Sequence, residues 1–492
     1  MKEKTDKYDH ILKYTSIFGG VQGLNILISL VRNKIVTTLL GPSGMGLVAL
    51  FNSVVNFISQ ATTFGISFSA VRHVSELFDK GDETEIQHFV GVVRVWCLLT
   101  ALLGVFVCVV MGPLLSAYTF SWGDHTLHFI LLAPAVGLMA ITGGEVAILK
   151  GARQLRSLAI IQVYNIFLSL LISIPLYYFF WQAGIVPVIV LTTISSMVLT
   201  IIHSYRLYPL TFKGTFGQLK EGAAMVKLGI AFVIAGILGS GAEMYIRSYL
   251  NISGDLHIVG LYSTGFMLTV TYAGMVFSAM ETDYFPRLSA VAFVREEMNR
   301  TVNRQIEVSL LIVSPMLCSL IIGMPIIIPL LFTNEFLPVV QMAQAAVFAM
   351  YIKAMSLPIS YLTLARADSL AYLIIEAVDD VLLVLFVIWG FHYWGLIGTG
   401  FALSLSYLVD IIIIYIYTFL RYGYQVSLPV IQYAAIQLPL GIAAYIITFI
   451  DNQLIYWLLG ILLCFVSLAV SVHILQQKTS LWNTLKRKFI KK

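Results

Sequence analysis

The chain has 492 residues, of which 59% are hydrophobic and only 11% are charged, with a formal net charge of +5. Soluble domains carry about 25% charged residues, so this composition excludes an ordinary water-soluble protein. Apolar runs of about 20 residues, the length of a membrane-spanning helix, recur from end to end. Segments of about ten residues that alternate in polarity, as in a transmembrane β-barrel, do not dominate. We therefore predict an all-α polytopic membrane protein.

In chain order, we expect about fourteen transmembrane helices. We place them at 11–32, 46–71, 88–112, 127–149, 157–181, 185–205, 226–248, 257–282, 305–332, 338–363, 370–390, 394–419, 428–449 and 453–475. The first apolar run has no small-residue cleavage site and is interpreted as a span, not a signal peptide. The odd-numbered loops, such as FTNEFLP and FHYWG, are too short to hold a folded domain.

Lysine and arginine predict the orientation of these spans. Most of the 30 cationic residues lie at the N-terminus, in or near the even-numbered connections, or in the C-terminal tail LKRKFIKK. The exceptions are Arg32, Lys34, Arg247 and Lys353. Because cationic loops stay in the cytoplasm, we expect both termini and the even-numbered loops to be cytoplasmic.

The sequence contains an internal repeat with offsets of 211 to 216 residues. The segment KGARQLRSLAIIQ at 150–162 matches LARADSLAYLIIE at 364–376. Other matches in the same order are Gly46 over Gly260, Arg72 over Arg287, Pro113 over Pro329 and Gly184 over Gly395. Spans one to six and seven to twelve are therefore predicted to be two copies of one unit. Parallel repeats of this kind are typical of transporters, with the substrate site at the repeat interface.

The repeat predicts the domain organisation. An N-terminal lobe and a C-terminal lobe would be joined by a cytoplasmic linker and followed by an extra helix pair and a basic cytoplasmic tail. These parts are expected at 1–206, 226–421, 207–225, 422–476 and 477–492, respectively.

Two arginines lie at equivalent places in the two halves. Arg32 ends the first span and Arg247 ends the seventh. A charge at the bilayer centre costs about 2.5–3.5 kcal/mol on insertion scales, so such residues face a cavity, a partner or the headgroups. One hypothesis is that both face a central cavity and bind an anion. The alternative is that both snorkel to the outer headgroups. For Lys34, which is nearer the outer surface, snorkelling is favoured.

Lys353 is the strongest single candidate for function. It lies in the middle of AQAAVFAMYIKAMSLPISYL, too deep to snorkel with ease. It requires a polar cavity or an ion pair. A structural pair with Glu243 or Glu145 is the competing interpretation.

Several acidic residues also lie within apolar segments. Glu145 is a candidate for ion coupling, for pairing with a cavity cation, or for protonation by burial. Glu243 precedes Arg247 by four residues, which favours a local ion pair on one helix face. Asp379 and Asp380, with Glu376 one turn earlier, suggest a coupling site less strongly than lobe packing or exposure to water.

No motif indicates an enzyme. The chain has no P-loop, no GxSxG and no HExxH sequence, so we expect neither catalytic residues nor a cofactor. Asp124, His125 and His128 could be drawn as a metal site, but a solvated loop is favoured and no metal is expected. The cysteines, all inside apolar runs, are interpreted as small core residues: Cys97, Cys108, Cys318 and Cys464.

The motifs RNKIVTTLLGPSGMGLVAL, VGLYSTGFML and GLIGTGFALSLSYLVDIIIIY resemble the polysaccharide-transport branch of the multidrug/oligosaccharidyl-lipid/polysaccharide exporter superfamily. The resemblance covers nearly the whole chain and is strongest to bacterial lipid-linked O-antigen flippases. It implies a V-shaped two-lobe transporter that works by alternating access in the bacterial inner membrane. The implied substrate is an undecaprenyl-pyrophosphate-linked glycan, moved from the cytoplasmic to the outer leaflet.

By type and place, Arg32, Arg247 and Lys353 would receive the pyrophosphate and sugars in a cationic central cavity. Membrane lipids and other glycan-assembly proteins are the expected partners, with no nucleic acid and a monomeric transport unit. The alternative function is an ion-coupled multidrug extruder of the same superfamily, with acidic cavity residues. A membrane-embedded glycosyl-lipid enzyme is a third class, but it would need a larger outward loop.

Overall fold

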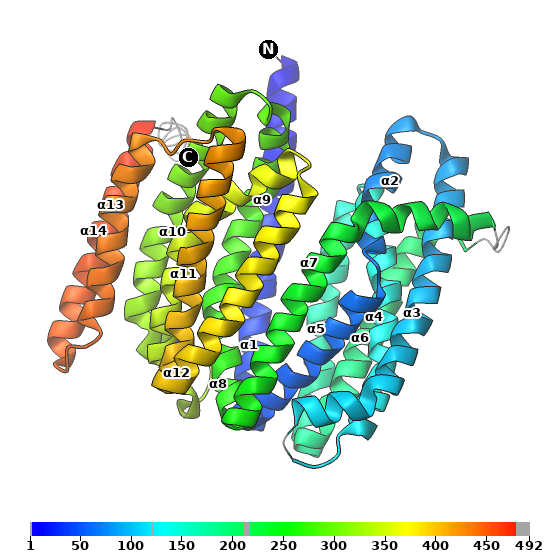
Figure 1. Ribbon diagram of the computed structural model, residues 1–492, viewed down its shortest axis with the longest axis horizontal. Helices are drawn as coiled ribbons and strands as arrows, with labels where there is room; N and C mark the ends of the chain where they lie inside the picture. Colours follow the sequence, from blue (N-terminus) through cyan, green and yellow to red (C-terminus); the bar gives the residue numbers. More distant parts are fainter. Residues whose placement is uncertain (1, 121, 211–216, 479–492) are drawn as a thin grey trace, which may run out of the picture. The chain divides into compact units, whose positions relative to one another are not determined.

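The computed structural model describes residues 2–120, 122–210 and 217–478, and these form α-helices joined by short turns (Figure 1). The first half of the chain contributes α1 (Lys2–Thr62), α2 (Ile66–Lys80), α3 (Glu83–Thr119), α4 (Thr126–Gly151), α5 (Leu155–Phe180) and α6 (Ile185–Leu207). The second contributes α7 (Gly217–Ser253), α8 (Leu256–Phe266), α9 (Tyr272–Val291), α10 (Arg295–Leu331), α11 (Val339–Ala365) and α12 (Ser369–Tyr422). The last two helices are α13 (Leu428–Ile447) and α14 (Gln453–Lys478).

Within the described residues, eight stretches are long and apolar enough to cross a membrane, and one of them runs through both α5 and α6. Two further helices each contain two expected spans. The backbone breaks at Gly41 in α1, with φ 65°, and at Gly395 in α12, with φ 57°. Glycine adopts positive φ without a Cβ penalty, which explains its use at both turns. The prediction of an all-α polytopic membrane protein is confirmed.

The second predicted span ends earlier than expected at its C-terminal end. α1 stops at Thr62 rather than near 71, and Phe64 and Gly65 both have positive φ before α2 begins. α2 is amphipathic and packs Ile66 and Ala70 into the core of the first half. A positive φ ends a regular helix, so the apolar run here is divided between two helices.

The chain divides into two compact units, residues 1–260 with 331–333, and residues 261–330 with 334–492. In the first unit, α7 packs against α1, α2 and α3. The repeat instead assigns α7 to the second half of the chain. The domain boundaries drawn from the repeat therefore remain a prediction.

Each unit has its own apolar core. The core of the first lies among α2, α3 and α4 and includes Ile66, Ala70, Val90, Val93, Ala147 and Ile148. The core of the second lies among α9, α10, α11 and α12 and includes Tyr284, Leu288, Met298, Val302, Ile359 and Leu362.

The repeat is visible in the turns between helices, with a register of 214 residues. After α4, the amide of Gln154 donates to the carbonyl of Leu149 at 2.9 Å, and after α11 the amide of Asp368 donates to Thr363 at 2.8 Å. Arg153 in the first turn has φ 56°, and Ala367 in the second has φ 55°. Both copies thus end the helix with the same left-handed residue, although neither is glycine.

Candidate functional site

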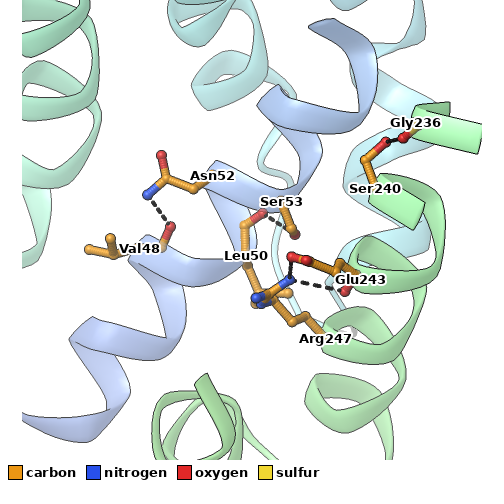
Figure 2. Close-up of polar contacts among 8 residues, drawn as sticks. All are labelled: Val48, Leu50, Asn52, Ser53, Gly236, Ser240, Glu243 and Arg247. Carbon is orange, nitrogen blue, oxygen red and sulfur yellow. Dashed lines mark hydrogen bonds and ion pairs between the residues drawn. The ribbon is translucent and has the colours of Figure 1, made fainter. Parts of the chain in front are cut away.

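A polar cavity of about 600 Å³ lies in the first unit between the second part of α1 and the middle of α7. Its lining is dominated by hydroxyl and amide side chains, and it contains one carboxylate, from Glu243. The lining residues are Ser53, Asn56, Ser59, Gln60, Thr63, Gly65, Ser67, Met139, Val233, Gly236, Ser240 and Glu243. Figure 2 shows α1 and α7 presenting several of these side chains.

Helical spacing explains why these polar groups share one surface. On α1, Ser53, Asn56 and Gln60 follow each other at intervals of three and four residues, which places them on one helix face. On α7, Gly236, Ser240 and Glu243 follow the same pattern. In an otherwise apolar chain, two facing polar stripes form a polar cavity. The regular spacing of neutral polar residues on the two helices could have predicted this cavity, but the prediction considered only charged residues.

The local ion pair predicted on α7 is present at the edge of this cavity. The Nη1 atom of Arg247 lies 2.7 Å from Oε2 of Glu243 and 3.4 Å from the Glu243 carbonyl oxygen (Figure 2). The Arg247 side chain is 12% exposed, whereas that of Glu243 is 45% exposed. The carboxylate therefore reaches into the cavity while the guanidinium lies behind it. Arg247 is not among the residues that line the cavity.

The two cations at the end of the first predicted span also lie outside the cavity lining. Arg32 is close enough to Tyr177 of α5 for its charge to act on the phenol. Lys34 donates a hydrogen bond to the carbonyl oxygen of Phe332. Lys34 thus hydrogen-bonds to the protein within the first unit, whereas a snorkelling lysine would extend to the lipid headgroups. The roles proposed for Arg32 and Arg247 in anion binding remain predictions.

Lys353 lies in the second unit, on α11. Its Nζ atom is 5.6 Å from the centroid of the Tyr407 ring, and its charge acts on Glu376, Asp379 and Asp410 of α12. The acidic neighbours of Lys353 therefore come from the adjacent helix α12. Glu145 and Glu243, the partners considered for Lys353, are paired with Arg94 and Arg247 instead. The Asp379 carboxylate is itself held in place by the Ser406 hydroxyl, which donates to it at 2.8 Å.

Glu145 is part of a buried ion pair. Oε1 of Glu145 lies 2.9 Å from Nε of Arg94 in α3, and the second oxygen accepts from Nη2 of Arg94 at 3.3 Å and from the Ser204 hydroxyl at 2.5 Å. Both side chains are less than 10% exposed, and the guanidinium stacks on Tyr205 at 4.1 Å. Arg94 lies in the expected span 88–112, and no motif in the sequence marks it as the partner of Glu145.

The loop expected to be solvated is only partly so, because Asp124 is exposed whereas His125 is buried. His125 is 7% exposed and lies 4.1 Å from the Phe120 ring and 4.4 Å from the Trp122 ring, measured between centroids. Asp124 caps the start of α4 by accepting from the amide of Thr126 at 2.9 Å. Burial, and after it the nearby His128, lowers the pKa of His125. Within the described ranges, no group of three metal-ligating side chains is assembled.

The second unit holds two apolar cavities, of about 790 and 600 Å³, along α12 and α13. Ile442 lines both. Together they offer an apolar surface of the kind that accepts a hydrocarbon chain.

Comparison with known proteins agrees with this architecture. Residues 35–341 match the family described as polysaccharide biosynthesis protein. The lipid III flippases of Escherichia coli and Shigella flexneri are each 21% identical over 398 residues, covering 77% of this chain and 91% of theirs.

Solved structures show the same fold at low sequence identity. The lipid II flippase MurJ, in an inward closed conformation, matches with a TM-score of 0.63 and 15% identity over 95% of this chain and 99% of that one. An inward-facing multidrug resistance MATE family transporter of the MOP superfamily gives a TM-score of 0.68 and 15% identity over 81% and 94%. With the fold of these transporters and a family match over more than half its length, the chain belongs to the polysaccharide biosynthesis protein family.

Proposed function

We propose that this chain is a flippase that moves an undecaprenyl-pyrophosphate-linked oligosaccharide across the bacterial inner membrane. The O-antigen repeat unit, or a related glycan, would pass from the cytoplasmic to the outer leaflet by alternating access. The transport unit would be a monomer with cytoplasmic termini, and glycan-assembly proteins would be its partners. The relatives named as flippases of lipid III support the class of substrate.

The observation that carries this proposal is the polar cavity between α1 and α7. A sugar presents many hydroxyls, each of which loses water on entering a membrane protein and needs a donor or an acceptor in return. Serine hydroxyls and the amides of Asn56 and Gln60 supply both kinds of group without a fixed charge. Such a lining suits a neutral or weakly charged glycan better than it suits a cationic drug.

The pyrophosphate requires cations as well. Arg247 is the candidate nearest to this cavity, and a pyrophosphate would compete with Glu243 for its guanidinium. Arg32 and Lys353 are the other cations proposed to bind the pyrophosphate. Glu145 and Glu243 are the acidic residues predicted to couple an ion or to pair with a cavity cation. Since Arg94 and Ser204 hold Glu145, we propose a structural role for it. The prenyl chain would lie along apolar surface, such as the cavities of α12 and α13.

The test is complementation of a flippase-deficient bacterial strain. Arg247→Ala and Lys353→Ala are each expected to abolish the surface glycan at normal protein levels. Arg72→Ala is the matched control, because Arg72 forms an exposed pair with Glu76 in α2. Full surface glycan in both the Arg247 and the Lys353 variants would refute the assignment of these cations.

A multidrug extruder is the second candidate, and one observation favours it. Lys353 is close enough to Glu376, Asp379 and Asp410 for its charge to act on all three, and this excess of acidic groups is suited to a cation. The fold is shared with a MATE transporter. Resistance to cationic drugs on expression, without restored surface glycan, would favour this function over the flippase.

A further inference from the structure

The turns that follow α4 and α11 each contain an arginine, Arg153 and Arg366, and the two have different partners. In the first copy, Arg153 follows α4, and its Nη2 atom lies 2.6 and 2.8 Å from the two carboxylate oxygens of Asp79. The same guanidinium lies 5.8 Å from the centroid of the Phe78 ring. In this copy, therefore, Arg153 contacts both an aromatic ring and the carboxylate of the next residue in sequence.

The second copy has its arginine one residue earlier in the turn, beside an aromatic ring but without the carboxylate. Arg366 follows α11, and its Cζ atom lies 5.4 Å from the Phe293 ring and 4.8 Å from the Tyr422 ring. In the register that aligns Arg72 with Arg287, Phe293 takes the place of Phe78 and Val294 takes the place of Asp79. Within the described part of the chain, the Nη2 atom of Arg366 donates to the sulfur of Met298, at 3.6 Å. Among the described residues, no carboxylate lies within 4 Å of this guanidinium.

The nearest acidic residue in sequence is committed elsewhere. Oδ2 of Asp368 accepts from the hydroxyls of Tyr417 and Tyr422, both at 2.8 Å, and Oδ1 accepts from the amide of Ala371 at 3.3 Å. Burial acts to raise the pKa of Asp368, but these hydrogen bonds outweigh it and the pKa lies below its ordinary value. Asp368 thus stays ionised and orients Tyr422, which in turn holds the face of the Arg366 guanidinium.

The surroundings of Arg366 indicate what would neutralise it. Phe293 and Val294 are 74% and 54% exposed, as expected of apolar groups at the surface of a bilayer. The site lies in a connection that the distribution of lysine and arginine predicts to be cytoplasmic. The rings of Phe293 and Tyr422 contact the guanidinium but accept no conventional hydrogen bond from it, and a phosphate oxygen is a strong acceptor for guanidinium donors. We propose that Arg366, held by Phe293 and Tyr422, binds the phosphate of an anionic phospholipid headgroup in the cytoplasmic leaflet.

The test uses the purified full-length chain in detergent and records the thermal midpoint as lipid is added. Phosphatidylglycerol is the anionic probe, phosphatidylcholine the zwitterionic one, and inorganic phosphate tests a free anion. Arg366→Ala removes the cation. Val294→Asp restores the carboxylate of the first copy and leaves Arg366 in place. Arg153→Ala is the matched control, since that arginine already has a carboxylate partner.

Phosphatidylglycerol is expected to raise the midpoint of the wild type and of Arg153→Ala, and this shift should be lost in Arg366→Ala and Val294→Asp. Phosphatidylcholine and inorganic phosphate should produce no comparable shift. Equal stabilisation of the wild type and Val294→Asp by phosphatidylglycerol would overturn the proposal. A shift of the same size with inorganic phosphate would overturn the assignment to a lipid. Transport is not the readout, so the result is independent of the proposed flippase function.

Discussion

At the scale of single residues, the ion pairs of this chain differ in how deeply they are buried. Glu145 and Arg94 are both almost completely buried, 51 residues apart in sequence, and each satisfies the other. Arg72 and Glu76, in contrast, form a pair within one helix whose side chains are 63% and 54% exposed. Burial removes water as a competing partner, so the loss of one member costs much more in the buried pair than in the exposed one.

We predict that Glu145→Gln destabilises the protein by about 3–5 kcal/mol, because it leaves the Arg94 charge buried without a counter-charge. Glu76→Gln, the matched control, should change stability by less than about 1 kcal/mol, as is usual for exposed pairs. Thermal unfolding of both variants in detergent measures the difference. Equal midpoints for the two variants would show that the buried pair contributes no more than the exposed one.

At the scale of helices, the two copies of the repeat meet at a reciprocal contact. A Cβ at Gly46 of α1 would overlap the carbonyl oxygen of Leu256, and a Cβ at Gly260 of α8 would overlap that of Pro42. In the register of 214 residues, Gly46 is equivalent to Gly260 and Pro42 is equivalent to Leu256. Each copy therefore contributes the same pair of positions to the contact. This reciprocity is the signature of a two-fold relation between identical surfaces.

Further contacts in the first unit show a similar exchange. The amide of Asn251 in α7 donates to the carbonyl oxygen of Thr119 at the end of α3, at 2.9 Å. Lys34 in α1 donates to Phe332, which follows α10. A helix from each half is therefore bound to the end of a helix from the other half.

We predict that Gly46→Ala and Gly260→Ala each destabilise the protein, by roughly 1–3 kcal/mol, since a methyl group would force the two backbones apart. The two-fold relation further predicts similar costs for both. Gly274→Ala is the control, because a Cβ there meets no atom within 4 Å. The yield of folded protein and its thermal midpoint measure the effect. A large cost at one glycine and none at the other would contradict the reciprocal contact.

At the scale of the whole molecule, the proposed transport of a glycan would use the cavity between α1 and α7. We predict that Asn56→Leu combined with Gln60→Leu lowers the transport rate roughly tenfold, because losing two hydrogen bonds of about 0.5–1.5 kcal/mol each weakens glycan binding. Gln87→Leu, on the exposed surface of α3, is the control. Surface glycan at matched protein levels provides the measurement. An unchanged rate in the double variant would exclude these amides from the glycan path.

Much of the architecture was predictable because it depends on local pattern. Hydropathy and length predicted a polytopic helical protein, and repeated short motifs predicted the two copies. The match of Gly184 over Gly395 was three residues out of register, however. The structure aligns Trp181, with φ 53°, with Gly395, with φ 57°, at 214 residues. A backbone conformation can be shared by residues of different type, and a sequence match cannot detect that.

The sequence by itself determined that this chain spans a membrane as helices, that it repeats, and that Glu243 and Arg247 lie one turn apart on one helix. Each of these follows from periodicity within a segment. Only the tertiary structure decided that Arg94 neutralises Glu145, that Lys353 faces the carboxylates of α12, and that neutral polar stripes on α1 and α7 line a cavity. Those outcomes depend on which helix faces meet, and helix packing is set by side-chain shape across distant segments rather than by any single stretch of sequence.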